Sequence, residues 1–250
     1  MVDSSYASEF GADEFDGAVA SAIEVKGLVL SGVLARDTPA MLSAGRALFE
    51  LGLFVEAGEV YDYVIEMRGE IFEAVCGRAG VYMALMGEAD ATGEVFKALA
   101  AEAAVLFERV LSVGRVGGGV LRDYATLLLL TDRTADADEL LQPSAIEESE
   151  GEELIDLLYL KGMASLCSGE LTRAELYFKR MTDEDPSRWE GVFGACLCAK
   201  SAGEFARARG MIRVLRSGDQ LLAQIVERVG GPGGVSFREL AAMIAAGVLE

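Results

Sequence analysis

The sequence contains no histidine, only five lysines and a single tryptophan among its 250 residues. The absence of histidine excludes a Ser-His-Asp triad and a Cys-His nucleophile pair. It also excludes every zinc or copper site that needs an imidazole ligand. The commonest routes to hydrolytic and metal-assisted chemistry are therefore closed to this chain.

Cysteine is also scarce, and none of the four forms a Cys-x-x-Cys pair: Cys76, Cys167, Cys196 and Cys198. On a helix, the last two would point to nearly opposite sides because only one residue separates them. A chain of this size without a secretion signal is not expected to be built on disulfides. We therefore interpret the four thiols as small buried apolar groups.

No long uncharged apolar run is present. The stretches between Lys26 and Arg36 and between Asp123 and Asp132 are far shorter than the roughly 18 to 20 residues of a membrane-spanning helix. Residues 1–17 are acidic and lack the basic and apolar regions of a signal peptide. These features predict a soluble protein of the cytoplasm.

Basic residues are few: 22 lysines and arginines stand against 41 aspartates and glutamates. The formal net charge is −19 and the pI is about 4.4. Long-range repulsion from phosphate groups argues against partners among nucleic acids and anionic membranes. The acidic surplus is interpreted as a solubility device.

Two glycine-rich stretches and one acidic run were considered as ligand sites. The stretches "VGGGV" (116–120) and "GGPGG" (230–234) lack the Gly-Lys-Ser/Thr ending and the preceding strand of a phosphate loop, so they are expected to be linkers. The glutamates of 147–153 lack the spacing of a calcium loop and are expected to form a solvated loop. The sequence therefore predicts no catalytic residue, cofactor or metal.

The sequence does contain a repeated motif. Residues 169–186 read "GELTRAELYFKRMTDEDP", and residues 203–216 read "GEFARARGMIRVLR". Earlier copies are "AGRALFELGLFVEAGEVYDYV", with Gly45 and Gly52, and "AGVYMALMGEADATGEVFKAL", with Gly80 and Gly87. Equivalent glycines recur with a period of about 34 to 35 residues, which indicates a chain of similar structural units.

The pattern resembles the tetratricopeptide repeat, a helix–turn–helix unit of about 34 residues. The resemblance implies an all-α fold, an α-solenoid of antiparallel helical hairpins. The tryptophan expected early in each unit is absent, and only Pro186 closes a unit in the expected place. No stretch alternates with the period of a strand, so we expect no sheet and about ten to thirteen helices.

Each repeated position has a physical role in such a hairpin. Gly162 and Ala174 are small enough to let two helices approach closely, and aromatic residues such as Phe178, Tyr61 and Phe96 are expected to fill the gap to the next hairpin. We expect tight inter-helix turns near Gly52, Gly87, Gly169 and Gly203. Outside the repeats, Thr38 and Ser236 are predicted to cap helices.

The glycine-rich and acidic breaks between the predicted helices divide the chain into six segments. They are an acidic disordered tail (1–15), N-terminal hairpins (16–112), a degenerate hairpin (113–142), an acidic loop (143–153), C-terminal hairpins (154–229) and a terminal capping helix (235–250).

In proteins of the resembled family, the first helix of each hairpin lines a concave groove. The resemblance therefore implies partner-binding residues at Tyr159, Met163, Leu166, Phe193, Leu197, Lys200, Arg46 and Phe49. Because these side chains are mostly apolar and lysine is scarce, a clamp for an acidic C-terminal tail is not expected. The groove suits an amphipathic helix or hydrophobic segment of a protein partner, or a second copy of the chain. The alternative is that these apolar side chains, which form a stripe along the first helices, belong to the ordinary hydrophobic core.

Two functions remain open. The first is a non-enzymatic interaction module, most simply a scaffold or accessory subunit of a larger intracellular assembly. The mean hydropathy of +0.30 favours it, because excess apolar surface has to be covered. The second is an enzyme or small-ligand-binding protein with a site between helices that carries no motif.

Overall fold

The computed structural model describes residues 12–34, 36–90, 93–114, 116–229 and 236–245. These residues form fourteen helices and no strand, which confirms the all-α prediction and slightly exceeds the expected number of helices. The chain divides into two compact units, Met1–Arg115 and Val116–Glu250.

The N-terminal unit is built from two complete hairpins and one additional helix. Its helices are α2 (Ala12–Leu30), α3 (Thr38–Glu50), α4 (Phe54–Arg68), α5 (Phe72–Glu88) and α6 (Glu94–Ser112). α3 pairs with α4, α4 packs on α5, and α5 pairs with α6. α2 packs against both α3 and α4, and Ala22 and Val29 on α2 join the core that these two helices form.

The C-terminal unit continues the same plan. Its helices are α7 (Gly118–Leu130), α8 (Thr134–Leu140), α9 (Pro143–Glu147), α10 (Gly151–Cys167), α11 (Leu171–Glu184), α12 (Trp189–Ser201), α13 (Phe205–Gly218), α14 (Gln220–Arg228) and α15 (Phe237–Ala245). The first helices pack in the order α7, α10, α12 and α14, and the second helices α8, α11 and α13 pack between them. α15 contacts α14 and α7.

Three of the four predicted glycine turns are confirmed. Gly52, Gly169 and Gly203 have φ values of 74°, 78° and 78°, in the left-handed region that costs glycine least. Each turn closes with the same pair of backbone hydrogen bonds; at Gly169 its N–H donates to Leu166 and that of Glu170 donates to Ser165, at 3.0 and 2.8 Å. The α7–α8 turn has the same bonds, with Asp132 at φ 59° in the place of the glycine.

The prediction for Gly87 was wrong. α5 continues through this residue to Glu88, and α6 begins at Glu94. The Ala89 N–H donates to the Met86 carbonyl at 3.2 Å and closes the last turn of the longer helix. α5 thus extends one residue beyond its repeat glycine, whereas α3 and α10 end two residues before theirs.

The predicted aromatic contact between hairpins places one ring against two glycines, one on each of two helices. The fully buried ring of Phe178 on α11 lies against Gly162 on α10, where an added Cβ would meet the ring at 2.7 Å. Gly194 on α12 approaches the same ring still more closely. In the N-terminal unit, Gly45 and Gly77 contact Tyr61 in the same way. In both cases the aromatic residue stands midway in the sequence between its two glycines, and the contact links one hairpin to the next.

Two local predictions need correction. The cap of α3 is Asp37 rather than Thr38, because its side chain accepts a hydrogen bond from the Ala40 N–H at 3.0 Å. The segment 143–153 is mostly helical, since it holds α9 and the start of α10. Ser236 does accept a hydrogen bond from the Glu239 N–H at 3.4 Å, as expected of a cap. Of the predicted tail, residues 1–11 lie outside the described residues and residues 12–15 belong to α2; residues 246–250 of the predicted terminal helix are also outside them.

The aromatic contact predicts the effect of a single added methyl group. Gly194→Ala should lower the free energy of unfolding by about 1 to 3 kcal/mol, because the Cβ would overlap the buried Phe178 ring. Urea denaturation of the purified chain measures this difference.

The matched control is Gly210→Ala on α13, where an added Cβ meets nothing within 4 Å. This variant should be stabilised by about 0.5 to 1 kcal/mol, since alanine restricts the unfolded chain. Equal unfolding midpoints for the two variants would contradict the proposed packing.

Candidate partner-binding surfaces

Most of the predicted groove stripe is core. Met163 and Leu166 on α10 have exposed fractions of 0% and 3%, and Phe193 and Leu197 on α12 are fully buried. α10 is buried on almost all sides, because α7, α8, α11 and α12 all pack against it. These four side chains therefore present no open apolar surface, and the alternative interpretation as core is the one that their burial supports.

Helix α14 explains why the α12 stripe is covered. It packs on α12 and α13 and buries its own apolar face, Leu222, Ala223, Ile225 and Val226. Lys200, predicted to stand at the open end of the stripe, instead donates hydrogen bonds to the Val226 and Val229 carbonyls at the C-terminus of α14. A cation is favourable there because the last carbonyls of a helix are unpaired and partially negative.

The remaining predicted residues differ in their exposure. Tyr159 is half-buried, with its ring 6.3 Å from that of Phe178, and burial raises the pKa of its phenol. In the N-terminal unit, Phe49 is half-buried beside Phe54 at 5.3 Å between ring centroids, and Arg46 is exposed. The eight residues thus do not form one surface within either unit.

An open apolar surface does exist in the N-terminal unit, on α2. Five large apolar side chains are exposed there or just beyond its end, with exposed fractions from 36% to 68%: Ile23, Val25, Leu28, Leu30 and Val33. Beside them lies a groove of about 710 Å³ between α2 and α3. It is lined by small and apolar side chains with one carboxylate: Ala18, Ser21, Ala22, Val25, Ala40, Ser43, Ala44, Ala47, Glu50 and Leu51.

Sequence analysis missed this groove. Ala40, Ser43 or Ala44, and Ala47 recur at spacings of three and four on α3, and Ala18, Ala22 and Val25 do so on α2. That pattern is the signal that could have found it, because residues at these spacings share one helix face. Small residues on one face leave room for the backbone of another element.

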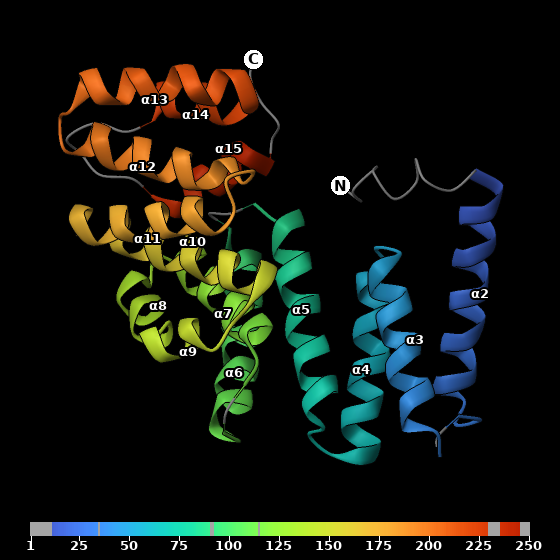
Figure 1. Cartoon of the computed structure of the whole chain (residues 1–250). Coiled ribbons are helices and arrows are strands. Elements are labelled where there is room, and N and C mark those ends of the chain that lie inside the picture. Colours follow the sequence, from blue (N-terminus) through green and yellow to red (C-terminus); the bar gives the residue numbers. More distant parts are fainter. Residues whose placement is uncertain (1–11, 35, 91–92, 115, 230–235, 246–250) are drawn as a thin grey trace. The chain divides into compact units, whose positions relative to one another are not determined.

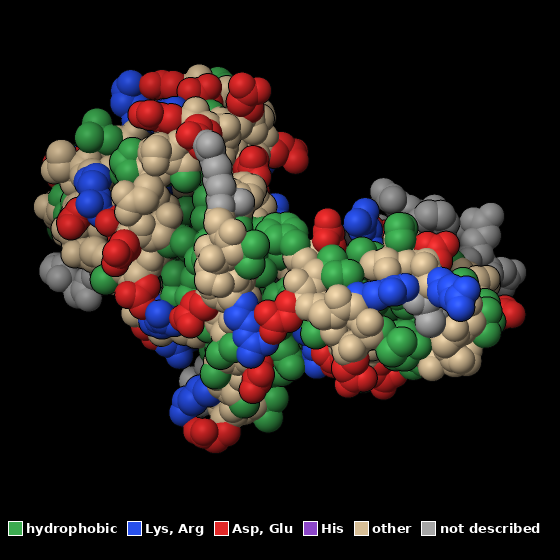
Figure 2. Space-filling view, turned by 90° about the horizontal axis from the view of Figure 1, so that it is seen from below, with side chains coloured by type: hydrophobic (Ala, Val, Ile, Leu, Met, Phe, Trp, Pro, Cys, Tyr) green, Lys and Arg blue, Asp and Glu red, His purple; other side chains and the backbone are tan. Residues whose placement is uncertain are grey.

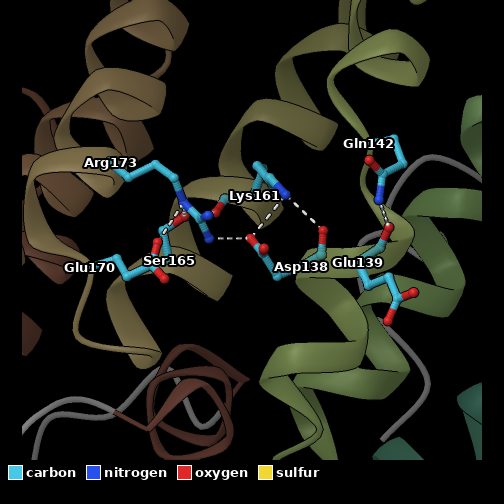
Figure 3. A network of polar contacts seen from close by, with 7 residues as sticks. All are labelled: Asp138, Glu139, Gln142, Lys161, Ser165, Glu170 and Arg173. Atoms are coloured by element: carbon cyan, nitrogen blue, oxygen red, sulfur yellow. Dashed lines mark hydrogen bonds and ion pairs between the residues drawn. The ribbon is translucent and has the colours of Figure 1, made fainter.

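A polar cluster in the C-terminal unit was also considered as a site (Figure 3). The Lys161 side chain, 6% exposed, lies 2.9 Å from the Asp138 carboxylate and donates to the Asp138 backbone carbonyl at 2.7 Å. Arg173 contacts the same carboxylate at 2.5 Å and donates to Ser165 at 3.0 Å. The cluster joins α8, α10 and α11 through contacts among its own side chains and the Asp138 backbone, so we interpret it as structural.

The four cysteines are free thiols. Burial raises the pKa of Cys196 to about 11 and that of Cys198 to about 12. Both thiols therefore carry their protons at neutral pH, the opposite of an activated nucleophile. Among the described residues, no group of three or more Cys, Asp or Glu side chains could hold a metal ion.

Carboxylates lie among the Lys and Arg side chains on the face shown in Figure 2, and many are paired, as Arg207 is with Glu175 at 2.6 Å. No helix within the described ranges is long and apolar enough to cross a membrane.

Neither a family model nor a curated protein matches the chain. Several solved structures do match the chain. YrrB, described as a TPR protein with an unusual peptide-binding site, aligns with a TM-score of 0.60 and 21% identity, covering 77% of this chain and 93% of that one. PilF of Pseudomonas aeruginosa aligns with a TM-score of 0.58 and 17% identity, covering 82% of this chain and 96% of that one.

The chain has the fold of tetratricopeptide repeat proteins. This likeness confirms the resemblance drawn from the glycine, alanine and aromatic spacing, and with it the α-solenoid class. At these identities, the tetratricopeptide repeat fold is what the comparison establishes.

The polar cluster predicts that removing the Asp138 carboxylate destabilises the fold much more than removing the Lys161 ammonium. Asp138→Ala should cost about 3 kcal/mol, because it removes the carboxylate partner of the buried Lys161 ammonium. Lys161→Met should change the free energy of unfolding by less than about 1 kcal/mol, because an apolar side chain of similar length replaces the buried charge. Urea titrations of both variants measure this; a Lys161→Met variant as unstable as Asp138→Ala would show that the ion pair contributes more than its burial costs.

The buried thiols predict a loss of stability at alkaline pH. As the pH rises above about 9, thiols in the unfolded chain lose their protons, whereas Cys196 and Cys198 keep theirs up to about 11 and 12. The free energy of unfolding should therefore fall between about pH 9 and 12. The slope should be smaller in Cys198→Ala, as measured by urea titrations at several pH values. Identical slopes would mean that the native thiol ionises as easily as an exposed one.

Proposed function

We propose that this protein is an interaction module that binds an amphipathic helix of a partner protein in the groove between α2 and α3. The observation that carries the proposal is the groove itself, about 710 Å³ in volume and lined by alanine, serine, valine and leucine side chains with one glutamate. Exposed apolar surface on this scale in a soluble chain is characteristic of an interaction site.

The arrangement of the helices argues for a helical ligand. α2 packs on α3, the first helix of the next hairpin, as α4 packs on α5 in the same unit, and α2 also contacts α4. In such an array, the first helix of the hairpin to which α2 belongs would lie in the groove between α2 and α3. Among the described residues no helix lies there, so a helix supplied by a partner completes the packing.

The lining also limits the chemistry of the partner. Alanine and serine side chains leave room that large apolar side chains at i, i+3 and i+4 would fill. Glu50 lies at the groove, and the whole chain carries a net charge of −19. A partner helix with basic residues beside its apolar face is therefore favoured over a second copy of this acidic chain.

The proposal extends to the cellular role. A module with exposed apolar residues along α2 suits a scaffold or accessory subunit, because a stable assembly would cover them. Four free thiols are in keeping with a reducing compartment such as the cytoplasm. YrrB, which has the same fold, is described as having a peptide-binding site, and this supports binding of a peptide segment by analogy of fold alone.

A display library of helical peptides, selected on the full chain, tests this function. Selected peptides should be amphipathic and basic. Their affinity should fall about tenfold or more in Ala47→Glu, because the new carboxylate would be buried against the apolar face of the ligand.

Val95→Glu on α6 is the matched control, since this valine is 64% exposed and does not line the groove. It should leave the affinity unchanged. Peptides that bind Ala47→Glu and the wild-type chain equally, or a selection that enriches no helical peptide, would rule out the groove as the binding site.

A further inference from the structure

The C-terminal helix α15 occupies a defined position in the C-terminal unit (Figure 1). It packs on α14 and α7, the last and the first of the row of first helices. The backbone of Phe237 also lies close to the thiol of Cys167, at the C-terminus of α10. α15 therefore contacts two first helices rather than pairing with one of them.

The contacts of α15 are those of a bound amphipathic helix. Phe237 and Leu240, three residues apart, have exposed fractions of 9% and 1%, whereas Ile244 is 39% exposed. Arg238 forms an ion pair with Asp132 in the α7–α8 turn. A cation is doubly favoured there, since the last carbonyls of α7 are close in sequence to this carboxylate.

The same contacts are few. α15 has nine residues, too few to be a stable helix on its own. Two buried apolar side chains, one partly exposed ion pair and one cap at 3.4 Å hold it in place. By comparison, ten residues of α10 are buried. Elements held by few contacts open locally while the rest of the fold persists.

We propose that the surface under α15, formed by α7 with Asp132, by Cys167 and by α14, is a second helix-binding site that α15 fills in cis. Its ligand is a partner helix of the same chemistry: an aromatic residue, then a basic residue, then a leucine three positions after the aromatic one. The partner competes with α15 and displaces it. This site is independent of the groove between α2 and α3.

The test uses the full chain and a fluorescent peptide of residues 235–248. In the wild-type chain the tethered helix competes at a high effective concentration, so the peptide should bind weakly. Leu240→Asp removes the most deeply buried contact of the tethered helix and should tighten peptide binding about tenfold or more. Fluorescence anisotropy measures both affinities, and a peptide carrying the same Leu240→Asp change should bind neither chain.

Charge reversal identifies the surface. Adding Asp132→Lys to Leu240→Asp should abolish the gain for the natural peptide. A peptide with Arg238→Glu should restore it, because the ion pair is re-formed in the opposite sense. Circular dichroism and thermal melting check that each variant is folded. If Leu240→Asp does not fold, Arg238→Glu in the full chain should give a smaller gain of the same sign.

Three results would overturn the proposal. The first is equal affinity of the peptide for the wild-type and Leu240→Asp chains. The second is no binding to any folded variant. The third is a concentration-dependent dimer of the wild-type chain that Leu240→Asp abolishes, because the ligand would then be α15 of a second copy rather than a partner protein.

Discussion

The contact on which the hairpin array depends is an aromatic ring held between two glycines on neighbouring first helices. Phe178 on α11 touches Gly162 within its own hairpin and Gly194 in the next, and Tyr61 does the same with Gly45 and Gly77. Because glycine has no Cβ, the ring can lie directly against two helix backbones at once. This contact sets the distance between successive hairpins and therefore determines which faces of the first helices remain free.

Few of those faces do remain free in the C-terminal unit. Its first helices α10 and α12 are enclosed by their neighbours, and α14, with its C-terminus bonded to Lys200, covers the stripe of α12. An accessible apolar groove is found instead at the edge of the N-terminal array, between α2 and α3, while α15 packs on α7 and α14 in the C-terminal unit. In both units the proposed binding positions follow from where the regular packing of hairpins is incomplete.

The local part of this fold could be predicted from the sequence, and the long-range part could not. Gly52, Gly169 and Gly203 were found because a tight turn needs a left-handed residue at a fixed spacing. Gly194 was missed because it stands slightly closer to Gly162 in the sequence than the period of the repeat would place it. The spacing of Met163 and Leu166 on α10 and of Phe193 and Leu197 on α12 marks an apolar face on each helix, but periodicity does not tell whether another helix covers that face. The covering contacts, such as Lys200 with Val226, join residues that are far apart in the sequence and share no pattern.

The central claim is that α10 is core, whereas α15 is a weakly held occupant of a binding surface. Native-state hydrogen exchange of the full chain, followed by mass spectrometry, tests it most directly. The amides of α10 should exchange only through global unfolding, while those of α15 should exchange much faster by local opening that leaves α10 protected. Equal protection of the two helices would contradict the account, because α15 would then be part of the core; rapid exchange in α10 would contradict it as well.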